Sequence, residues 1–331
     1  MHDGVSKSVA ITVKVPARLH LGFLDLNGGL GRRFGGIGLA VSDLGTTLTI
    51  ERAKFSNVSG PEADRVRHHL QKMERCLALH NGHNIRISEV VPPHAGLGSG
   101  TQLALAVAAG LRRLHNLPLD IEGDALRLGR GARSGIGIGL FSRGGLVVDG
   151  GRGHELKPAP IIAHLPLPRH WRVLVILDPQ CQGIHGPEEG AAMAALPRMS
   201  DADAAHLCRL ILMKALPSLA EQDLVNFGDA VKELQFRLGD YFGPVQGGAR
   251  FMSRDVAAVL TVLDEAGAFG IGQSSWGPTG FAFAPSPDEA DRLALIARRH
   301  PNGRGLDIRV CEGLNCGAEI VAQAHAGEVG Q

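Results

Sequence analysis

The stretch with the clearest chemical potential is a glycine-rich loop that joins an alternating segment to a long Ala/Leu-rich segment. The loop reads Gly96-Leu97-Gly98-Ser99-Gly100-Thr101-Gln102. Its glycines let the backbone take positive φ values and approach a ligand closely, and the first N–H groups of the following helix have no partner inside that helix. The helix dipole and the hydroxyls of Ser99 and Thr101 favour an anion. The segment predicts a phosphate-binding loop, with a tight turn that only relieves crowding as the plainer alternative.

Arginine dominates the basic residues, with 27 arginines against seven lysines. A guanidinium group binds phosphate or carboxylate through two parallel hydrogen bonds. Four arginines flank glycine-rich turns, namely Arg18, Arg32, Arg33 and Arg133. We expect two of these four to bind phosphate or carboxylate and the others to lie at the surface or between domains. A GC-rich genome is an equally good explanation of the overall bias toward arginine.

Composition excludes several classes of protein. The chain has 331 residues, 44% of them hydrophobic, and a formal net charge of +1. This length and apolar content predict two domains, and the charge gives no argument for a nucleic-acid or membrane partner. Five cysteines are scattered without metal-site spacing, which favours a cytoplasmic protein without a disulfide framework or structural zinc. No signal sequence or bilayer-spanning apolar run is recognised, so we expect small-molecule ligands.

Periodicity and turn residues predict an alternation of strands and helices. Alternating or wholly apolar runs predict strands at 9–15, 46–52, 84–91, 144–149, 171–177, 269–273, 280–284 and 306–311. Helical spacing of apolar residues predicts helices at 61–80, 101–116, 202–216, 221–239, 251–266 and 287–300. A proline-rich passage between 156 and 168 predicts the domain boundary. The pattern indicates an α+β protein.

The phrase Pro93-x-x-Gly96-Leu97-Gly98-Ser99-Gly100 resembles the second motif of the GHMP kinase superfamily, which binds nucleotide phosphates. Five further segments make the chain similar to the β-ribofuranosylaminobenzene 5′-phosphate synthase family of that superfamily, at residues 16–25, 31–38, 131–137, 180–186 and 273–280. The resemblance covers about residues 10–320. It implies a domain at 1–165 like the second domain of ribosomal protein S5, which holds the glycine loop, and a ferredoxin-like domain at 166–331. The ligand cleft is then expected between the two domains.

The resemblance also implies a reaction. Members of the synthase family condense 5-phosphoribosyl pyrophosphate with 4-aminobenzoate, release CO₂ and pyrophosphate, and act in methanopterin biosynthesis. We therefore expect Mg²⁺, no organic cofactor and a homodimer, while the choice between 4-aminobenzoate and 4-hydroxybenzoate stays open. The chain departs from several GHMP kinases in the segment Ser134-Gly135-Ile136-Gly137, where those kinases place an aspartate at the last position. An ATP-dependent small-molecule kinase is the alternative function, and a binding module without turnover is a second one.

Roles for individual residues follow from the matched motifs. We expect the loop residues Gly96 to Gln102, together with Arg18, to bind the phosphate groups. Asp25 is the first choice for a partner of the oxocarbenium centre or of magnesium, Arg32 or Arg33 for the group that holds the benzoate carboxylate, and Trp276 for stacking on the ring. A turn role for Asp25 and a packing role for Trp276 are the alternatives. His20 is a further catalytic candidate, and the remaining candidates for binding substrate or phosphate are Arg133, Ser134, Gln182, His185, Gln246, Ser274 and Ser275.

Overall fold

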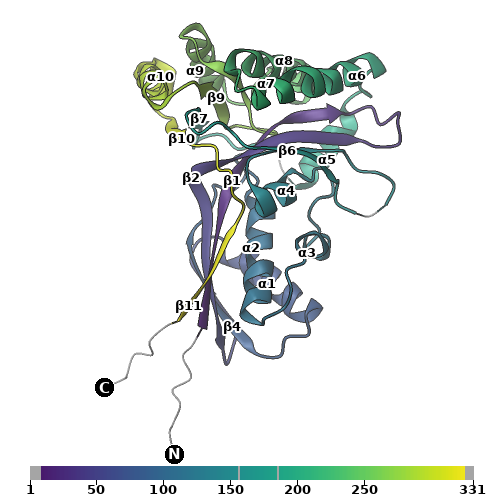
Figure 1. The fold of residues 1–331 in the computed structure, drawn as a ribbon, viewed down its shortest axis with the longest axis vertical. Helices are drawn as coiled ribbons and strands as arrows, with labels where there is room; N and C mark the ends of the chain where they lie inside the picture. Colours follow the sequence, from purple (N-terminus) through teal and green to yellow (C-terminus); the bar gives the residue numbers. More distant parts are fainter. Residues whose placement is uncertain (1–8, 156, 185, 325–331) are drawn as a thin grey trace, which may run out of the picture.

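A computed structural model describes residues 9–155, 157–184 and 186–324, and its first half is built on a sheet dominated by two long strands. These strands, β1 (Val9–Asp25) and β2 (Phe34–Ala53), pair antiparallel, and the sheet runs in the order β11-β1-β2-β4-β3. The other members are β3 (Asn57–Ser59), β4 (Gly82–Glu89) and β11 (Glu319–Ala324). In addition, β5 (Leu146–Asp149) pairs with β2 and with β6 (Ile161–Leu165). Strand β11 brings the C-terminal end of the described chain beside β1 (Figure 1).

Four helices cover the first sheet, and the buried one among them carries the glycine loop at its start. This helix, α2 (Ser99–Leu114), packs against β1 and β2. A Cβ on Gly110 would lie 2.7 Å from Cδ1 of Ile50, so the glycine allows a close approach of helix and sheet. The others are α1 (Ala63–Cys76), α3 (Ile121–Arg127) and α4 (Ile136–Arg143). Burial of α2 fixes the position of the loop at its N-terminus.

The second half has the strand order of a ferredoxin-like fold, which confirms that prediction. Its antiparallel sheet runs β10-β7-β9-β8 and contains β7 (Arg172–Leu177), β8 (Phe269–Gln273), β9 (Gly280–Ala284) and β10 (Asp307–Cys311). The helices α8 (Leu224–Phe242) and α9 (Arg254–Glu265) precede β8, and α10 (Pro287–Arg299) joins β9 to β10. Three shorter helices come earlier, namely α5 (Gly186–Ala195), α6 (Asp201–Leu210) and α7 (Leu216–Ala220).

One hydrophobic cluster joins the two halves. It contains buried side chains of β1 and β2 together with side chains of β7, α6 and α8, among them Leu21, Leu39, Trp171, Phe227 and Leu234. Figure 1 shows the helices of the second half above the upper ends of β1 and β2. Loops from both halves therefore meet beside this shared core.

Several elements differ from the sequence prediction. The periodicity that predicts strands at 9–15 and 46–52 marks only parts of β1 and β2, because glycines and a charged residue interrupt the alternation elsewhere. The predicted helix at 202–216 is α6 followed by a π-helical stretch, Ile211–Ala215, and then α7. Helix α3 has seven residues, too few for a clear helical period, and was not predicted. No helix in the described ranges is both long and apolar enough to cross a membrane.

Candidate functional site

Helix α2 begins at a glycine in the left-handed region, without a side-chain cap. Gly98 has φ +75°, and its carbonyl accepts hydrogen bonds from the N–H groups of Thr101 (3.1 Å) and Gln102 (3.2 Å). A Cβ on Gly98 would lie 2.1 Å from Nε of Arg18. Only glycine meets both demands, the positive φ and the space for the guanidinium. Without a side-chain cap, the N–H groups of Ser99 and Gly100 at the start of the helix are left for an anion.

Two segments distant in sequence hold the glycine loop in place. The Oγ of Ser274 donates to the Gly96 carbonyl (2.9 Å) and accepts from the His20 N–H (3.0 Å). The Leu97 carbonyl accepts from the Arg18 N–H (3.2 Å). Ser274 is fully buried, so these bonds are shielded from water. The structure thus brings together the first strand, the glycine loop and the loop between β8 and β9.

A cleft with a volume of about 370 Å³ opens beside the first turn of α2. Among the described residues, its ionised lining is three arginines and one carboxylate, that of Glu189. This excess of positive charge at a helix N-terminus favours an anionic ligand. The lining residues are Arg18, Arg65, His94, Gly96, Gly98, Ser99, Gly100, Thr101, Arg130, Ile184, Gly186, Glu189, Ser275, Trp276 and Gly277.

Arg18 is a buried cation with unused donors. Its Nε and Nη1 atoms are buried and make no hydrogen bond within the described part of the chain. Burial lowers the pKa of Arg18 to about 10, against the opposing effect of the negative charges of Glu189 and Asp149. The guanidinium is therefore still protonated at neutral pH. Because a buried unpaired charge is costly, this geometry calls for a bound anion.

Gly137, at the start of α4, faces the same guanidinium. A Cβ at this position would lie 3.0 Å from Cγ2 of Thr101 and 3.4 Å from Nε of Arg18. Any acidic side chain here would approach Arg18 directly. Glycine at position 137 therefore leaves Arg18 available to a ligand.

Glu189 is the acidic side chain of the cleft, and it is held by two donors. Its Oε1 lies 2.5 Å from Nη1 of Arg133 and accepts a hydrogen bond from Nε1 of Trp276 (3.1 Å). Trp276 is 3% exposed, and the centroid of its ring lies 4.6 Å from that of Phe242. The ring is packed in the protein, and the residue also lines the cleft. Arg133 therefore contacts the cleft indirectly, through its ion pair with Glu189.

His20 and Gln246 lie beside a second, much smaller cavity of about 20 Å³. Burial, and then the charge of Arg18, lower the pKa of His20 to about 3, so the imidazole is neutral at neutral pH. Its Nε2 atom is buried and has no hydrogen-bond partner in the described ranges. Gln246 accepts from Nε2 of Gln273 (3.1 Å), within a network that fixes the loop after β8. His20 and Gln246 thus stabilise the two segments that contact the glycine loop, namely β1 and the loop after β8.

Asp25, Arg32 and Arg33 stand outside the lining of the glycine-loop cleft. Asp25 accepts hydrogen bonds from the N–H groups of Asn27 (2.7 Å) and Gly28 (2.8 Å), so it closes a turn. Arg32 donates to the carbonyls of residues 150 and 151, both at 2.7 Å, and lines a different hollow. The Arg33 guanidinium lies 5.3 Å from the centroid of the Phe34 ring. The roles assigned to these three residues stay predictions.

The remaining candidates brace the site or lie at its edge. Ser134 donates to Asp149 (3.0 Å), a fully buried carboxylate whose pKa is raised by burial. Gln102 is buried, and its Nε2 donates to the Gly137 carbonyl (3.4 Å). Gln182 is exposed, and His185 lies outside the described residues. Ser275 lines the cleft, and its N–H donates to the His20 carbonyl (3.1 Å).

Sequence reasoning missed three charged residues of the cleft, namely Arg65, Arg130 and Glu189. Arg65 belongs to the polar face of a helix, where charged residues are ordinary. Arg130 directly precedes the motif-like segment 131–137, which is the one signal that could have drawn attention to it. Nothing in the sequence separates Glu189 from its neighbour Glu188.

The carboxylates of the site suit a metal that arrives with its ligand better than a resident metal. In the described ranges there is no cluster of three or more His, Cys, Asp or Glu side chains that could hold an ion. Mg²⁺ commonly binds through one or two carboxylates and the oxygens of a substrate phosphate. Glu189 is the carboxylate that the cleft offers to such a complex.

Comparison with known proteins gives matches over nearly the whole chain. Family models for the GHMP kinases N terminal domain and the GHMP kinases C terminal match residues 64–144 and 215–303. A β-ribofuranosylphenol 5′-phosphate synthase of Archaeoglobus fulgidus is 32% identical, over 94% of this chain and 99% of its own. That of Methanothermobacter thermautotrophicus is 28% identical, over 95% and 99%. A solved homoserine kinase of Cytophaga hutchinsonii, 16% identical, shares the fold with a TM-score of 0.67 over 97% of this chain and 99% of its own.

Proposed function

We propose that this chain, which belongs to the β-ribofuranosylphenol 5′-phosphate synthase family and carries both GHMP kinase domains, joins a phosphorylated ribose to a benzene ring. The substrates are 5-phosphoribosyl pyrophosphate and a benzoate with an electron-donating para group. The relatives' name favours 4-hydroxybenzoate, whereas the motifs alone left 4-aminobenzoate equally open. The enzyme is thus a decarboxylating phosphoribosyltransferase.

The reaction breaks one bond at the anomeric carbon and one at the ring carbon, and it joins these two carbons by a new bond. The bond from the anomeric carbon to pyrophosphate breaks, and pyrophosphate leaves with the electron pair. The ring carbon that bears the carboxylate then attacks the oxocarbenium-like centre, with electrons supplied by the para hydroxyl or amino group. The bond to the carboxylate breaks next, CO₂ leaves, and its electron pair restores the aromatic ring. No ring proton has to be removed, so the step has less need of a general base.

The single observation that carries the proposal is an uncapped helix N-terminus beside the guanidinium of Arg18, whose Nε and Nη1 have no hydrogen-bond partner in the described ranges. Both groups attract an anion. Pyrophosphate gains negative charge as it leaves the sugar, so both groups would stabilise its departure. Mg²⁺ would neutralise part of the diphosphate charge, with Glu189 as the available carboxylate. Cytoplasmic location and the homodimer stay predictions from the sequence.

A GHMP kinase is the second candidate, and Gly137 argues against it. A kinase that removes the proton of an acceptor hydroxyl gains about 10²- to 10⁴-fold from a positioned base. At the position that faces Arg18 and Thr101, this chain has no side chain at all. The glycine loop alone would suit either function.

Carboxyl-labelled substrates test the proposal. The protein is incubated with 5-phosphoribosyl pyrophosphate, Mg²⁺ and either labelled 4-hydroxybenzoate or labelled 4-aminobenzoate, without ATP. We expect labelled CO₂ and pyrophosphate in equal amounts, with the faster acid identifying the natural substrate. Absence of CO₂ release from both acids, together with ATP-dependent phosphorylation of an alcohol, would return the protein to the kinases.

A further inference from the structure

Two guanidinium groups from different elements converge on the first turn of α2. A Cβ on Gly100 would lie 3.0 Å from Nη2 of Arg65 and 3.2 Å from Nη1 of Arg130. Arg65 comes from α1, and Arg130 follows α3, yet both line the cleft beside Ser99 and Thr101. Like charges repel at this range, so their convergence needs an explanation.

The charge of Arg130 is not balanced by a neighbouring acid. Arg65 has an ion-pair partner, because its Nη1 lies 2.6 Å from Oε2 of Glu62. Arg130 has a hydrogen-bond contact with His69 instead, and its Nε is buried without a partner in the described part of the chain. Burial, and then the charge of Arg65, lower the pKa of Arg130. An anion between the two groups would relieve both effects.

His69 orients Arg130 toward the loop. Nη2 of Arg130 lies 3.3 Å from Nε2 of His69. A guanidinium can only donate, so Nε2 of the imidazole accepts and its proton sits on Nδ1. The ring is 4% exposed, and burial, followed by the charge of Arg130, lowers its pKa to about 3, which keeps it neutral. His69 therefore holds one end of the guanidinium and leaves Nη1 directed at Gly100.

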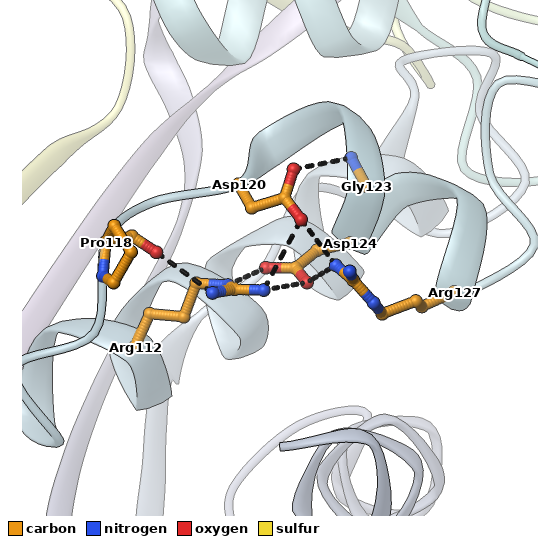
Figure 2. A network of polar contacts seen from close by, with 6 residues as sticks. All are labelled: Arg112, Pro118, Asp120, Gly123, Asp124 and Arg127. Carbon is orange, nitrogen blue, oxygen red and sulfur yellow. Dashed lines mark hydrogen bonds and ion pairs between the residues drawn. The ribbon is translucent and has the colours of Figure 1, made fainter.

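An ion-pair network around the buried Asp124 fixes the helix that leads into Arg130. Figure 2 shows Arg112 of α2 bound to both carboxylate oxygens of Asp124 in α3, while Arg127 binds Asp124 (2.7 Å) and Asp120 (2.6 Å). The N–H of Arg130 then donates to the Ala125 carbonyl of α3 (2.7 Å). The position of Arg130 is thus built into the packing of α3 on α2.

We propose that Arg65 and Arg130 form a diphosphate-binding subsite with the first turn of α2, and that His69 is its positioning residue. The assignment of this diphosphate to 5-phosphoribosyl pyrophosphate rests on the proposed function. The subsite lies in the same cleft as Arg18, so the three guanidinium groups together surround the leaving group. Two planar forks match the several oxygens of a diphosphate better than a single carboxylate.

Calorimetric titration with inorganic pyrophosphate tests the subsite independently of turnover. Arg130→Met and Arg65→Met should each weaken pyrophosphate binding about 10- to 100-fold, the loss typical of a charged hydrogen-bonding partner. Arg67→Met, on the exposed face of the same helix and paired with Asp64, is the matched control and should leave binding unchanged. Arg130→Lys should fall between wild type and Arg130→Met, because it keeps the charge without the fork.

Kinetics and a second ligand complete the test. The KM for 5-phosphoribosyl pyrophosphate should rise in Arg130→Met while the KM for the aromatic acid stays the same. His69→Leu should weaken pyrophosphate binding, and His69→Gln, which keeps a hydrogen-bond acceptor, should retain most of the wild-type affinity. Unchanged pyrophosphate affinity in correctly folded Arg130→Met and Arg130→Lys proteins would overturn the subsite. If both arginines control the binding of ADP as well as pyrophosphate and no CO₂ is released, the diphosphate subsite stands and the proposed function fails.

Discussion

The N-terminus of α2 differs from the N-termini of four helices in the ferredoxin-like half. Four helices of the second half begin at a residue whose side chain accepts a hydrogen bond from a backbone N–H three positions on, namely Ser200, Asp223, Ser253 and Ser286. Helix α2 begins at Gly98 with no side-chain cap. These four helices each satisfy an N–H group of their own first turn, whereas the helix at the cleft leaves its first turn open to the proposed anion.

The same contrast holds for buried polar side chains. Behind the second sheet, Gln235 donates to the Leu21 carbonyl (2.5 Å) and accepts from the Gln273 N–H (2.7 Å). Around the glycine loop, by contrast, Arg18 and Arg130 keep buried donor atoms without partners in the described ranges. Unsatisfied buried donors are rare in proteins, so their concentration at one cleft supports the proposal that a ligand binds there.

The largest effect is expected from Gly98→Val. The new side chain would have to occupy the space of the Arg18 Nε atom and would hold a positive φ, so both the guanidinium and the loop must move. We expect CO₂ release to fall by at least ~100-fold, as small displacements in an active site do. The left-handed conformation should also cost roughly 1–2 kcal/mol of stability. Steady-state kinetics with a denaturation curve checks both, and near-normal turnover would show that the loop is only structural.

Replacing single arginines by lysine separates the two candidate positions for the substrate anions. Arg18→Lys keeps the charge in the cleft but loses the fork, and should lower kcat/KM by roughly 10- to 100-fold. Arg32→Lys loses bonds to two loop carbonyls outside the cleft lining and should have a smaller effect. The KM for the aromatic acid distinguishes the two arginines. A larger rise of this KM in Arg32→Lys than in Arg18→Lys would favour Arg32 as the group that holds the benzoate carboxylate.

Gly137→Asp would give Arg18 an ion-pair partner, which it does not have among the residues that the structure describes. A carboxylate at this position would approach the guanidinium, compete with the substrate and lower kcat/KM by about tenfold or more. Gly137→Ala is the control, because its methyl group meets only Thr101 closely and adds no charge. Equal losses in the two variants would attribute the effect to crowding and not to charge.

Stability should depend on pH through the two buried neutral histidines. His20 and His69 have an ordinary pKa of 6.5 and pKa values of about 3 in the folded chain. Below pH 6.5 these histidines bind protons in the unfolded chain but stay neutral in the folded chain. Their contribution to the free energy of unfolding is therefore full above pH 6.5 and falls between pH 6.5 and 3. At pH 5 the loss is about 2 kcal/mol for each histidine. Urea unfolding of wild type and His69→Gln checks this, with exposed His68→Gln as the control that keeps the wild-type slope.

The smallest effect on activity is expected from a variant at one of the four helices with a side-chain cap. Ser286→Ala removes the acceptor for the Glu289 N–H (3.2 Å) at the start of α10. The expected result is a loss of about 1 kcal/mol in the free energy of unfolding and unchanged kcat/KM. An activity loss as large as that of a glycine-loop variant would abolish the distinction between packing helices and the ligand-binding helix.

The sequence was sufficient where the signal is local. Gly98, Ser99 and Thr101 form one contiguous phrase, so the loop and the helix behind it were predictable, as was the ferredoxin-like half through the motif resemblance. Arg65 and Arg130 were not predictable, because Arg65 reaches Gly100 through the packing of α1 on α2, and Arg130 through the packing of α3 on α2. Asp25 shows a different limit, since the hydrogen bonds it accepts from two backbone N–H groups match the turn role that the sequence left open, and its role toward a ligand stays a prediction.

Above all, we propose that a phosphate-bearing ligand binds the uncapped first turn of α2. A crystal structure of the protein with Mg²⁺ and pyrophosphate tests it most directly. We predict diphosphate oxygens within about 3 Å of backbone N–H groups at the start of α2 and of the guanidinium groups of Arg18 and Arg130. Pyrophosphate bound at another surface, with only water at the first turn of α2 and both guanidinium groups unmoved, would contradict the account.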